Sequence, residues 1–293
     1  MKSSYLKIAL AGVLLAATAF AQFGQQIQPP LNPNKRDNVT GAFEGWFKNP
    51  DGTFSLLLGY FNRNGQQEFD IPIGPDNKIE PGGPDRGQPT HFLTGRQWGM
   101  FAVKVPANFG ENKITWSLTA KGKTAVIPAS LLPDYEISPF SEAAVGNTPP
   151  VLSFEESGPA VQGPLGLTIS KTTTVAQPLS LTVFGSDDQK WTNLSGSRPN
   201  PNTIANPVRV HWVKFRGPGA VKFDTDRPTV EKIEPKSAAH VAMKFTGKAT
   251  TTATFSEPGD YVLHVIVNDL SGEGGGGEQC CWTFGDVKVS VKP

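Results

Sequence analysis

The feature that most constrains the fold is a pair of alternating apolar segments near the C-terminus. In the first, Tyr261, Leu263, Val265 and Val267 occupy every other position, and residues 287–291 repeat the pattern with valine. Because successive side chains of a β-strand point to opposite faces, each segment predicts a strand with one buried face. Together the segments predict the closing antiparallel pair of a β-sandwich, with its other face toward solvent.

Composition supports the same fold class for the whole chain. Gly and Pro account for 31 and 26 of the 293 residues, and no long segment has an apolar period of 3.6 residues. This favours strands joined by turns over helices, so the predicted class is all-β. The formal net charge is +1, with both signs scattered along the chain, and we therefore expect no nucleic-acid or membrane-surface footprint.

The first 21 residues have the pattern of a secretory signal peptide. Lys2 and Lys7 precede an apolar run over residues 8–20, and the small residues Ala19 and Ala21 precede the expected cleavage after Ala21. The run is shorter than the ~20 residues of a bilayer span, and no later segment approaches that length. We therefore expect a secreted or periplasmic protein without a transmembrane span. An uncleaved N-terminal anchor is the alternative.

Turn-rich segments divide the rest of the chain. Residues 22–38 are rich in Pro and Gln and predict a flexible leader. We expect an N-terminal β-sandwich over residues 39–140, a linker over 141–150 and a second β-sandwich over 151–293. Inside the first sandwich, residues 71–92 carry repeated Gly, Pro and Asp turn signals and predict a long surface loop.

The second sandwich resembles PKD-like domains, which are immunoglobulin-like modules of extracellular proteins. The resemblance covers about residues 147–293. It rests on Asn147-Thr-Pro-Pro-Val151, Ser186-Asp-Asp188, Gly217-Pro-Gly-Ala-Val-Lys-Phe223 and Phe255-Ser-Glu-Pro-Gly-Asp-Tyr261-Val-Leu. The chain departs from the family at residues 212–217, where Trp-Val-Lys-Phe-Arg-Gly replaces the Trp-x-Phe-Gly-Asp-Gly segment common in PKD domains.

What this resemblance implies is a secreted adhesion, spacer or binding module without catalysis. The mature length fits two domains, so the predicted fold is two immunoglobulin-like β-sandwich domains in tandem after the signal peptide. The final Pro-Gly-x-Tyr motif also has a physical role, because it places a tyrosine at the start of strand F. Residues 59–64 and 80–92 look like segments of uncharacterised exported bacterial proteins, and this likeness implies no function.

Four oxygen-bearing side chains follow two predicted strands of the second sandwich. Asp187 and Asp188 follow one strand, and Asn268 and Asp269 follow another. In this topology the B–C and F–G loops lie at the same end of the sandwich, so the four side chains are expected near one another. Oxygen ligands suit Ca²⁺, which takes roughly 6 to 8 of them. The alternative to a calcium site is that these side chains only cap turns, and the chain has no cofactor.

Two adjacent residues, Cys280 and Cys281, are the only cysteines. In an oxidising compartment they can bond to each other or to another chain, or stay as inert thiols. Adjacent α-carbons lie ~3.8 Å apart across a trans peptide, below the usual disulfide range of ~4.4 to 6.8 Å. A bridge between them is therefore expected to be strained and more easily reduced.

Two tryptophans are candidates for ligand binding. Trp191 lies in the predicted B–C loop, and Trp282 follows the glycine-rich segment that holds the cysteines. Two exposed rings at one rim could stack on a sugar or pack on a protein partner. The alternative is that Trp282 begins the last strand and folds inward.

The sequence contains no recognisable catalytic motif. The four histidines are dispersed, and we expect His211 and His264 on solvated strand faces. The best catalytic candidates are Asp85, Arg86 and His91, because long irregular loops often carry function.

The predicted function is an exported, non-catalytic binding, adhesion or structural module. Such a module would present its sandwich loops to an envelope component, a polymer or a protein partner. One alternative is an accessory carbohydrate-binding protein, which the six tryptophans favour. The other is a hydrolase that uses the loop over residues 71–92.

Overall fold

The computed structural model describes residues 38–142, 146–190, 205–271 and 280–293. Residues 37–293 group into one compact unit. The predicted signal peptide, nearly all of the predicted leader, and Trp191 lie outside the described residues. In the part of the chain that is described, no helix is both long and apolar enough to cross a membrane.

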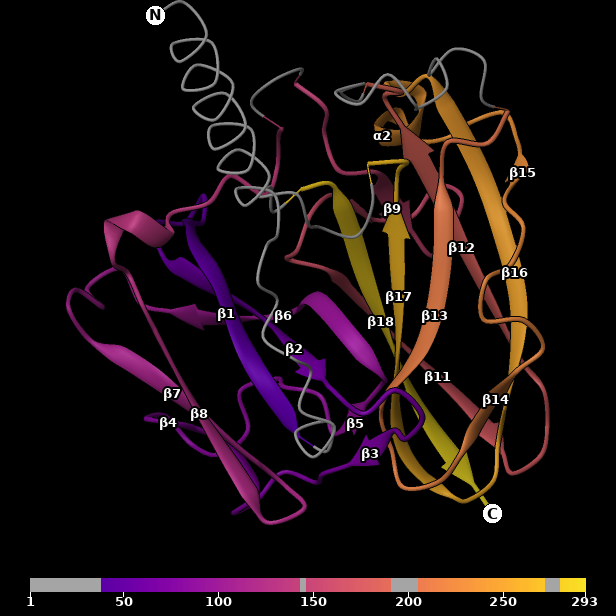
Figure 1. The fold of residues 1–293 in the computed structure, drawn as a ribbon. Coiled ribbons are helices and arrows are strands. Elements are labelled where there is room, and N and C mark those ends of the chain that lie inside the picture. Colours follow the sequence, from indigo (N-terminus) through magenta and orange to yellow (C-terminus); the bar gives the residue numbers. More distant parts are fainter. Residues whose placement is uncertain (1–37, 143–145, 191–204, 272–279) are drawn as a thin grey trace, which may run out of the picture. The chain divides into compact units, whose positions relative to one another are not determined.

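The first sandwich is built from the strands between residues 39 and 130 (Figure 1). In chain order these are β1 (Val39–Lys48), β2 (Phe54–Asn62), β3 (Phe69–Asp70), β4 (Asn77–Glu80), β5 (His91–Phe92), β6 (Gly95–Val105), β7 (Lys113–Ala120) and β8 (Lys123–Ser130). One antiparallel sheet has the order β1-β2-β6, the other has the order β4-β7-β8, and β3 pairs with β5. Lettered in the immunoglobulin manner, the two sheets read A-B-E and C-F-G.

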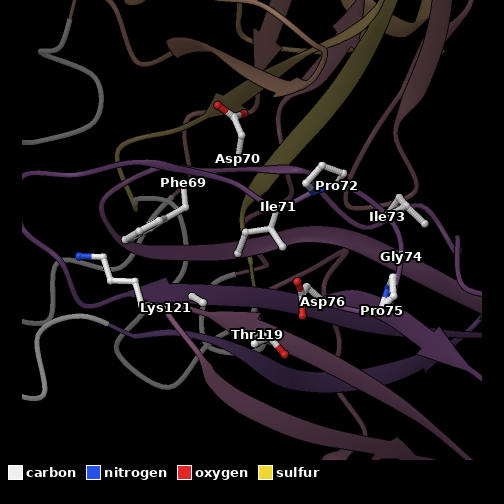
Figure 2. A pocket seen from close by; sticks show the side chains of 11 residues that line it. Phe69, Asp70, Ile71, Pro72, Ile73, Gly74, Pro75, Asp76, Thr119 and Lys121 are labelled. Atoms are coloured by element: carbon white, nitrogen blue, oxygen red, sulfur yellow. The ribbon is translucent and has the colours of Figure 1, made fainter.

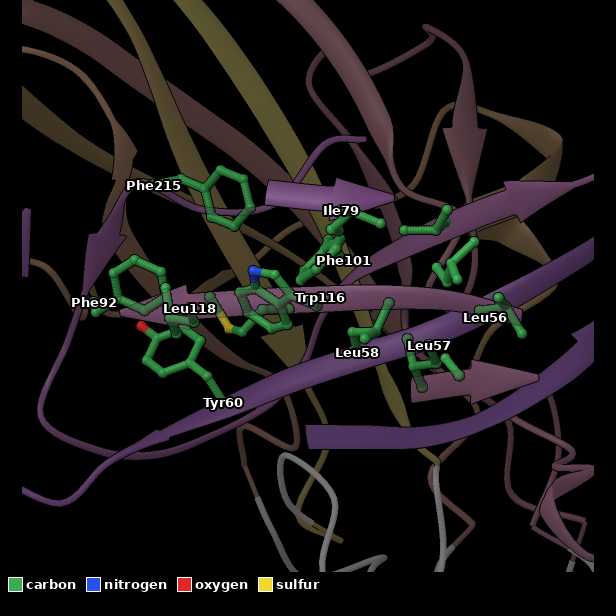
Figure 3. Packing of buried hydrophobic residues seen from close by; sticks show 14 of the residues in the cluster. Leu56, Leu57, Leu58, Tyr60, Ile79, Phe92, Phe101, Trp116, Leu118 and Phe215 are labelled. Carbon is green, nitrogen blue, oxygen red and sulfur yellow. The ribbon is translucent and has the colours of Figure 1, made fainter. Parts of the chain in front are cut away.

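The core of the first sandwich forms between these two sheets (Figure 3). Leu58 and Phe101 come from one sheet, and Ile79 and Trp116 come from the other. The rings of Phe101 and Trp116 meet edge to face with centroids 5.2 Å apart, an arrangement that aromatic pairs prefer. The buried indole nitrogen of Trp116 donates to the side-chain oxygen of Asn77 at 3.0 Å, so the polar end of the ring is satisfied.

The surface loop predicted over residues 71–92 is wrong in its middle part. Residues Asn77–Glu80 form strand β4, and Ile79 is fully buried in the core. The fully buried amide nitrogen of Asn77 donates to the carbonyls of Ile71 (2.9 Å) and Pro89 (2.8 Å), which holds the irregular segments on both sides of the strand. The dense Gly and Pro turn signals around a strand of four residues concealed it.

The second sandwich follows from residue 151 onward. Its strands are β9 (Val151–Ser153), β10 (Ala160–Val161), β11 (Leu167–Thr174), β12 (Leu179–Asp187), β13 (Arg209–Arg216), β14 (Val221–Phe223), β15 (Glu231–Lys232), β16 (Phe245–Phe255), β17 (Gly259–Asn268) and β18 (Trp282–Lys292). A short 3-10 helix, η2 (Pro133–Tyr135), precedes them, and helix α2 (Ala238–Val241) lies between β15 and β16.

One sheet of the second sandwich has the order β10-β9-β12-β16-β14, with β15 also pairing with β16, and the other has the order β11-β18-β17-β13. Strand β11 runs parallel to β18, from the Leu167–Gly285 pair to the Thr174–Lys292 pair, and the remaining pairs are antiparallel. The order β9-β12-β16-β14 opposite β13-β17-β18 is the A-B-E-D and C-F-G arrangement of immunoglobulin domains. The predicted all-β, immunoglobulin-like sandwich fold is confirmed.

The tyrosine at the start of β17 forms the corner that its sequence motif predicts. Tyr261 is 1% exposed, and its hydroxyl donates to the carbonyl of Glu257 at 2.8 Å and accepts the N–H of Gly219 at 3.0 Å. The preceding turn fits only without a side chain. Gly217 has φ +143°, and an added Cβ there would lie 2.0 Å from Cδ1 of Tyr261.

The second face of β17 is not solvated, although its alternation predicts that it should be. Residues of β13, β17 and β18 join the hydrophobic cluster of the first sandwich, and Phe215 is seen among them in Figure 3. His264 is 1% exposed, and its ring lies against Phe215 and Phe284 with centroids 5.1 and 4.8 Å away. Its Nδ1 is 2.7 Å from Oδ1 of Asp286. The predicted solvated position of His264 is therefore wrong, because residues of the first sandwich cover this face.

His211 is also more covered than the alternation of its strand predicts, since only 13% of its side chain is exposed. Burial, together with the nearby charge of Arg227, lowers the pKa of His211 to about 4, although Asp226 opposes this.

The domain boundary expected over residues 141–150 stays a prediction.

Candidate functional site

The catalytic candidates Asp85 and Arg86 hold structural contacts. Both oxygens of Asp85 accept hydrogen bonds from the guanidinium of Arg216, at 2.8 and 2.9 Å. These bonds outweigh partial burial and lower the pKa of the Asp85 carboxyl. Arg86 donates to the carbonyls of Pro81 (2.8 Å) and Lys104 (3.0 Å). Asp85 therefore joins the 71–92 segment to β13, and Arg86 joins it to β6.

His91, the third candidate, belongs to a charged group at the start of β3. Its Nδ1 lies 2.9 Å from Oδ1 of Asp70, and its Nε2 lies 3.1 Å from Oε2 of Glu68. The Nζ of Lys214, on β13, donates to the same Asp70 oxygen at 3.0 Å. Partial burial would raise the pKa of Asp70, but the hydrogen bonds from Lys214 and His91 outweigh it and lower that pKa. Asp85 therefore pairs with Arg216, whereas His91 shares Asp70 with Lys214, and the two candidates belong to different groups of charged residues.

A groove of about 410 Å³ lies beside this group (Figure 2). It is lined by residues 69–76 and by residues 119–121, which end β7 and begin the β7–β8 turn. Figure 2 shows Phe69 and Lys121 on one side of it and residues 72–75 on the other, and the Nζ of Lys121 lies 5.4 Å from the ring centroid of Phe69. Its lining of Phe, Ile and Pro, flanked by Asp70 and Asp76, suits the binding of a partly apolar ligand.

The structure places the ring of Trp282 in the core. The residue is 2% exposed, and a Cβ added to Gly99 of β6 would lie 2.2 Å from Cζ2 of the indole. This is the inward arrangement that the sequence left open. Of the other described tryptophans, three are also buried, namely Trp46, Trp116 and Trp212. Trp98 is partly exposed, with the guanidinium of Arg96 3.9 Å from its ring centroid.

The acidic side chains predicted after β12 and β17 do converge. Asp187 ends β12, and the charges of both Asp188 and Asp269 bear on it. The segment before β9 joins them, because Asn147 donates from Nδ2 to Oδ2 of Asp269 at 2.7 Å. In the same way Thr148 donates to Oδ2 of Asp188 at 3.1 Å. We call these five residues, Asn147, Thr148, Asp187, Asp188 and Asp269, the carboxylate end.

Two oxygens of the carboxylate end have no hydrogen-bond partner among the residues that the structure describes. Asp187 is fully buried, and its Oδ1 accepts the N–H of Gln189 at 2.7 Å while its Oδ2 accepts nothing. Asn147 is also fully buried, and its Oδ1 lacks a partner. Burial first, and then the charge of Asp269, raises the pKa of Asp187 to about 8.

Asp269 is held by donors on both oxygens. Its Oδ1 accepts from the N–H and the hydroxyl of Ser271, and its Oδ2 accepts from Asn147. Burial nevertheless raises the pKa of Asp269. Asn268 turns its amide nitrogen to the carbonyl of Asp269 at 3.1 Å. Within the described ranges, no three His, Cys, Asp or Glu side chains form a ready-made metal site.

Sequence reasoning missed Asn147 and Thr148. Strand A of an immunoglobulin-like sandwich begins at the end where the B–C and F–G loops lie, so the residues before Val151 could have been placed there from topology alone. The Asn147-Thr-Pro-Pro string carried that signal.

Cys280 and Cys281 are bonded to each other directly before β18, and both are buried. The Sγ of Cys281 lies 3.6 Å from the carbonyl oxygen of Asn147. Because a bridged sulfur carries no hydrogen, this is a packing contact. It places the cysteine pair against the backbone of the carboxylate end.

Neither a family model nor a curated protein matches the chain. Among solved structures, the D00-D0 domain of intimin is 12% identical with a TM-score of 0.25, and the match covers 87% of this chain and 100% of that one. A chimeric titin Z1Z2 is 11% identical with a TM-score of 0.22, over 88% of this chain and 98% of that one. Domains 4 and 5 of the S-layer protein SbsC are 11% identical with a TM-score of 0.20, and the match covers 87% of this chain and 98% of that one. TM-scores this low do not establish a shared fold, and the immunoglobulin-like fold is assigned from the strand order of the sheets.

Proposed function

We propose that the chain is an exported, non-catalytic binding module. The observation that carries the proposal is the use of the best acid–base candidates as structural ties. Asp85 is fixed by Arg216, and His91 shares Asp70 with Lys214. Groups that hold two sandwiches together in this way are poorly placed to exchange protons with a substrate.

Two further features support export. The first 21 residues have the signal-peptide pattern, and a disulfide between Cys280 and Cys281 is a bond that persists in oxidising compartments. We therefore place the mature protein in the periplasm or outside the cell.

The surface that we propose for a protein or polysaccharide partner is the groove beside β3. Ile73 lies on it and is partly exposed, so a ligand can reach its side chain. The burial of four strand tryptophans removes most of the ring surface that would favour a specialised carbohydrate-binding protein.

The test measures binding and turnover with the purified mature chain. Retention on envelope fractions and on a panel of insoluble polysaccharides is compared for the wild type, for Ile73→Arg, and for the control Leu165→Arg, whose residue is 47% exposed away from the groove. We expect retention that Ile73→Arg lowers at least tenfold and Leu165→Arg leaves unchanged. The chain is also screened for esterase, glycosidase and protease activity. Turnover of any substrate would overturn the proposal if His91→Ala abolishes it.

A further inference from the structure

At the carboxylate end, two buried acceptors have no donor among the described residues, and a positively charged partner would satisfy both. Oδ2 of Asp187 and Oδ1 of Asn147 are both hydrogen-bond acceptors, and both residues are fully buried. A buried polar atom without a partner costs about 1 to 3 kcal/mol, so native structures seldom leave two of them together. The Asn147 amide is in direct contact with Asp269, which places its orphan oxygen beside the acidic group.

Within the described ranges, the negative charge at this end exceeds the positive charge near it. Among the residues that the structure describes, three carboxylates converge here. Their positive neighbours are Lys190, whose Nζ lies 3.4 Å from Oδ2 of Asp188 on a side chain that is 50% exposed, and Lys244, whose charge also acts on Asp187. The other contacts to these carboxylates come from neutral donors such as Asn147, Thr148 and Ser271. Neutral donors do not balance buried charge, whereas a divalent cation does.

We propose that Ca²⁺ binds at the carboxylate end, with Asp187, Asp188, Asp269 and the side-chain oxygen of Asn147 as its ligands. Carboxylate and amide oxygens are the ligands that Ca²⁺ takes. Asn147 replaces Asn268, which the sequence had suggested, because the side-chain oxygen of Asn147 is among the described buried atoms without a hydrogen-bond partner, whereas that of Asn268 is not. Thr148 supplies one more oxygen, and water completes the roughly 6 to 8 ligands that the ion requires. This inference does not depend on the function proposed above.

Such an ion would join three separate segments of the chain. Asn147 precedes β9, Asp187 ends β12 with Asp188 directly after it, and Asp269 begins the loop after β17. The carbonyl of Asn147 also accepts the N–H of Glu142 at 2.8 Å, so the segment that enters the second sandwich is anchored to the same place. Calcium would therefore fix the entry of the chain into the second sandwich. Since these ligands are not already arranged as a metal site, we expect modest affinity.

The test is isothermal titration of the full mature chain with CaCl₂ after treatment with EDTA, alongside melting temperatures in Ca²⁺ and in EDTA. We expect one ion per chain with a Kd of about 10⁻⁴ to 10⁻³ M, the range of extracellular modules, and a melting temperature that rises with Ca²⁺ concentration. Asp187→Asn and Asp269→Asn each keep the side-chain shape and are expected to weaken binding at least tenfold. In EDTA, Asp187→Asn should melt no lower than the wild type, which shows that the variant folds.

The matched control is Asp134→Asn, in the exposed η2 helix, which should bind Ca²⁺ as the wild type does. No heat and no change in melting temperature at about 10 mM Ca²⁺, roughly ten times the weakest expected Kd, would overturn the proposal. Wild-type affinity in Asp187→Asn would overturn it as well. A melting temperature that follows pH but not Ca²⁺ would show that a proton, not a cation, satisfies Asp187.

Discussion

Removing one oxygen atom, by Tyr261→Phe, is expected to destabilise the second sandwich by about 2 to 4 kcal/mol. The change leaves the buried N–H of Gly219 without an acceptor, and it leaves the Glu257 carbonyl without this donor. An unsatisfied buried donor costs about 1 to 3 kcal/mol, and the second hydrogen bond adds about 1 kcal/mol. The ring itself stays packed against Phe255, with centroids 4.8 Å apart, so no large cavity opens.

Urea denaturation followed by circular dichroism measures this cost. We expect a lower midpoint with an unchanged slope, and a melting temperature lower by roughly 4 to 16 °C, given about 2 to 4 °C per kcal/mol for a chain of this size. The control is Tyr135→Phe, because Tyr135 is 49% exposed, and it should cost no more than about 0.5 kcal/mol. If Tyr261→Phe is as mild as this control, the hydroxyl does not hold the corner and the reasoning fails.

Three further results are expected. Because the pKa of His211 is lowered to about 4, the unfolded chain takes up a proton between about pH 6.5 and 4 that the folded chain does not. Stability should therefore fall by up to about 3 kcal/mol as pH drops through that window, and pH-dependent urea titrations should show a flatter profile for His211→Gln. Gly99→Ala should cost about 2 to 4 kcal/mol in the same assay, since Gly99 has φ +49° and the new Cβ meets Trp282; an unchanged midpoint would contradict that packing. Alkylation without reduction should leave Cys280 and Cys281 unmodified, and intact mass should be two hydrogens light, whereas two alkylated thiols would refute the bridge.

Local patterns predicted the second sandwich well, because each depends on neighbours in sequence. The Pro-Gly-x-Tyr motif places Tyr261 correctly, since a tyrosine four residues after Glu257 can reach its carbonyl within one turn of chain. The glycine at position 217 follows from the same corner, where no side chain fits against the ring.

Contacts between the sandwiches could not be predicted in this way. The alternation along β17 shows that one face is apolar, but it does not show that residues of the first sandwich cover the other face and bury His264. Strand β4 was not predicted for a related reason. Ile79 reaches the core only through the pairing of β4 with β7, a strand more than thirty residues further along.

The candidate site was predicted in part. The positions of Asp187, Asp188 and Asp269 at the ends of two strands follow from sandwich topology, whereas the choice between Asn147 and Asn268 depends on which side-chain oxygen lacks a partner among the described residues. The Asn147 amide is oriented by Asp269, which lies 122 residues further along the chain, and no local pattern encodes that contact.

The parallel pairing of β11 with β18 has a mechanical consequence. Eight consecutive residue pairs join the two strands, from Leu167–Gly285 to Thr174–Lys292. Tension between the chain entering β11 and the chain leaving β18 would pull the strands in opposite directions along their length. All the hydrogen bonds of the ladder would then carry the load at once instead of opening one after another, and a tethered copy of this sandwich would resist extension until the whole ladder sheared.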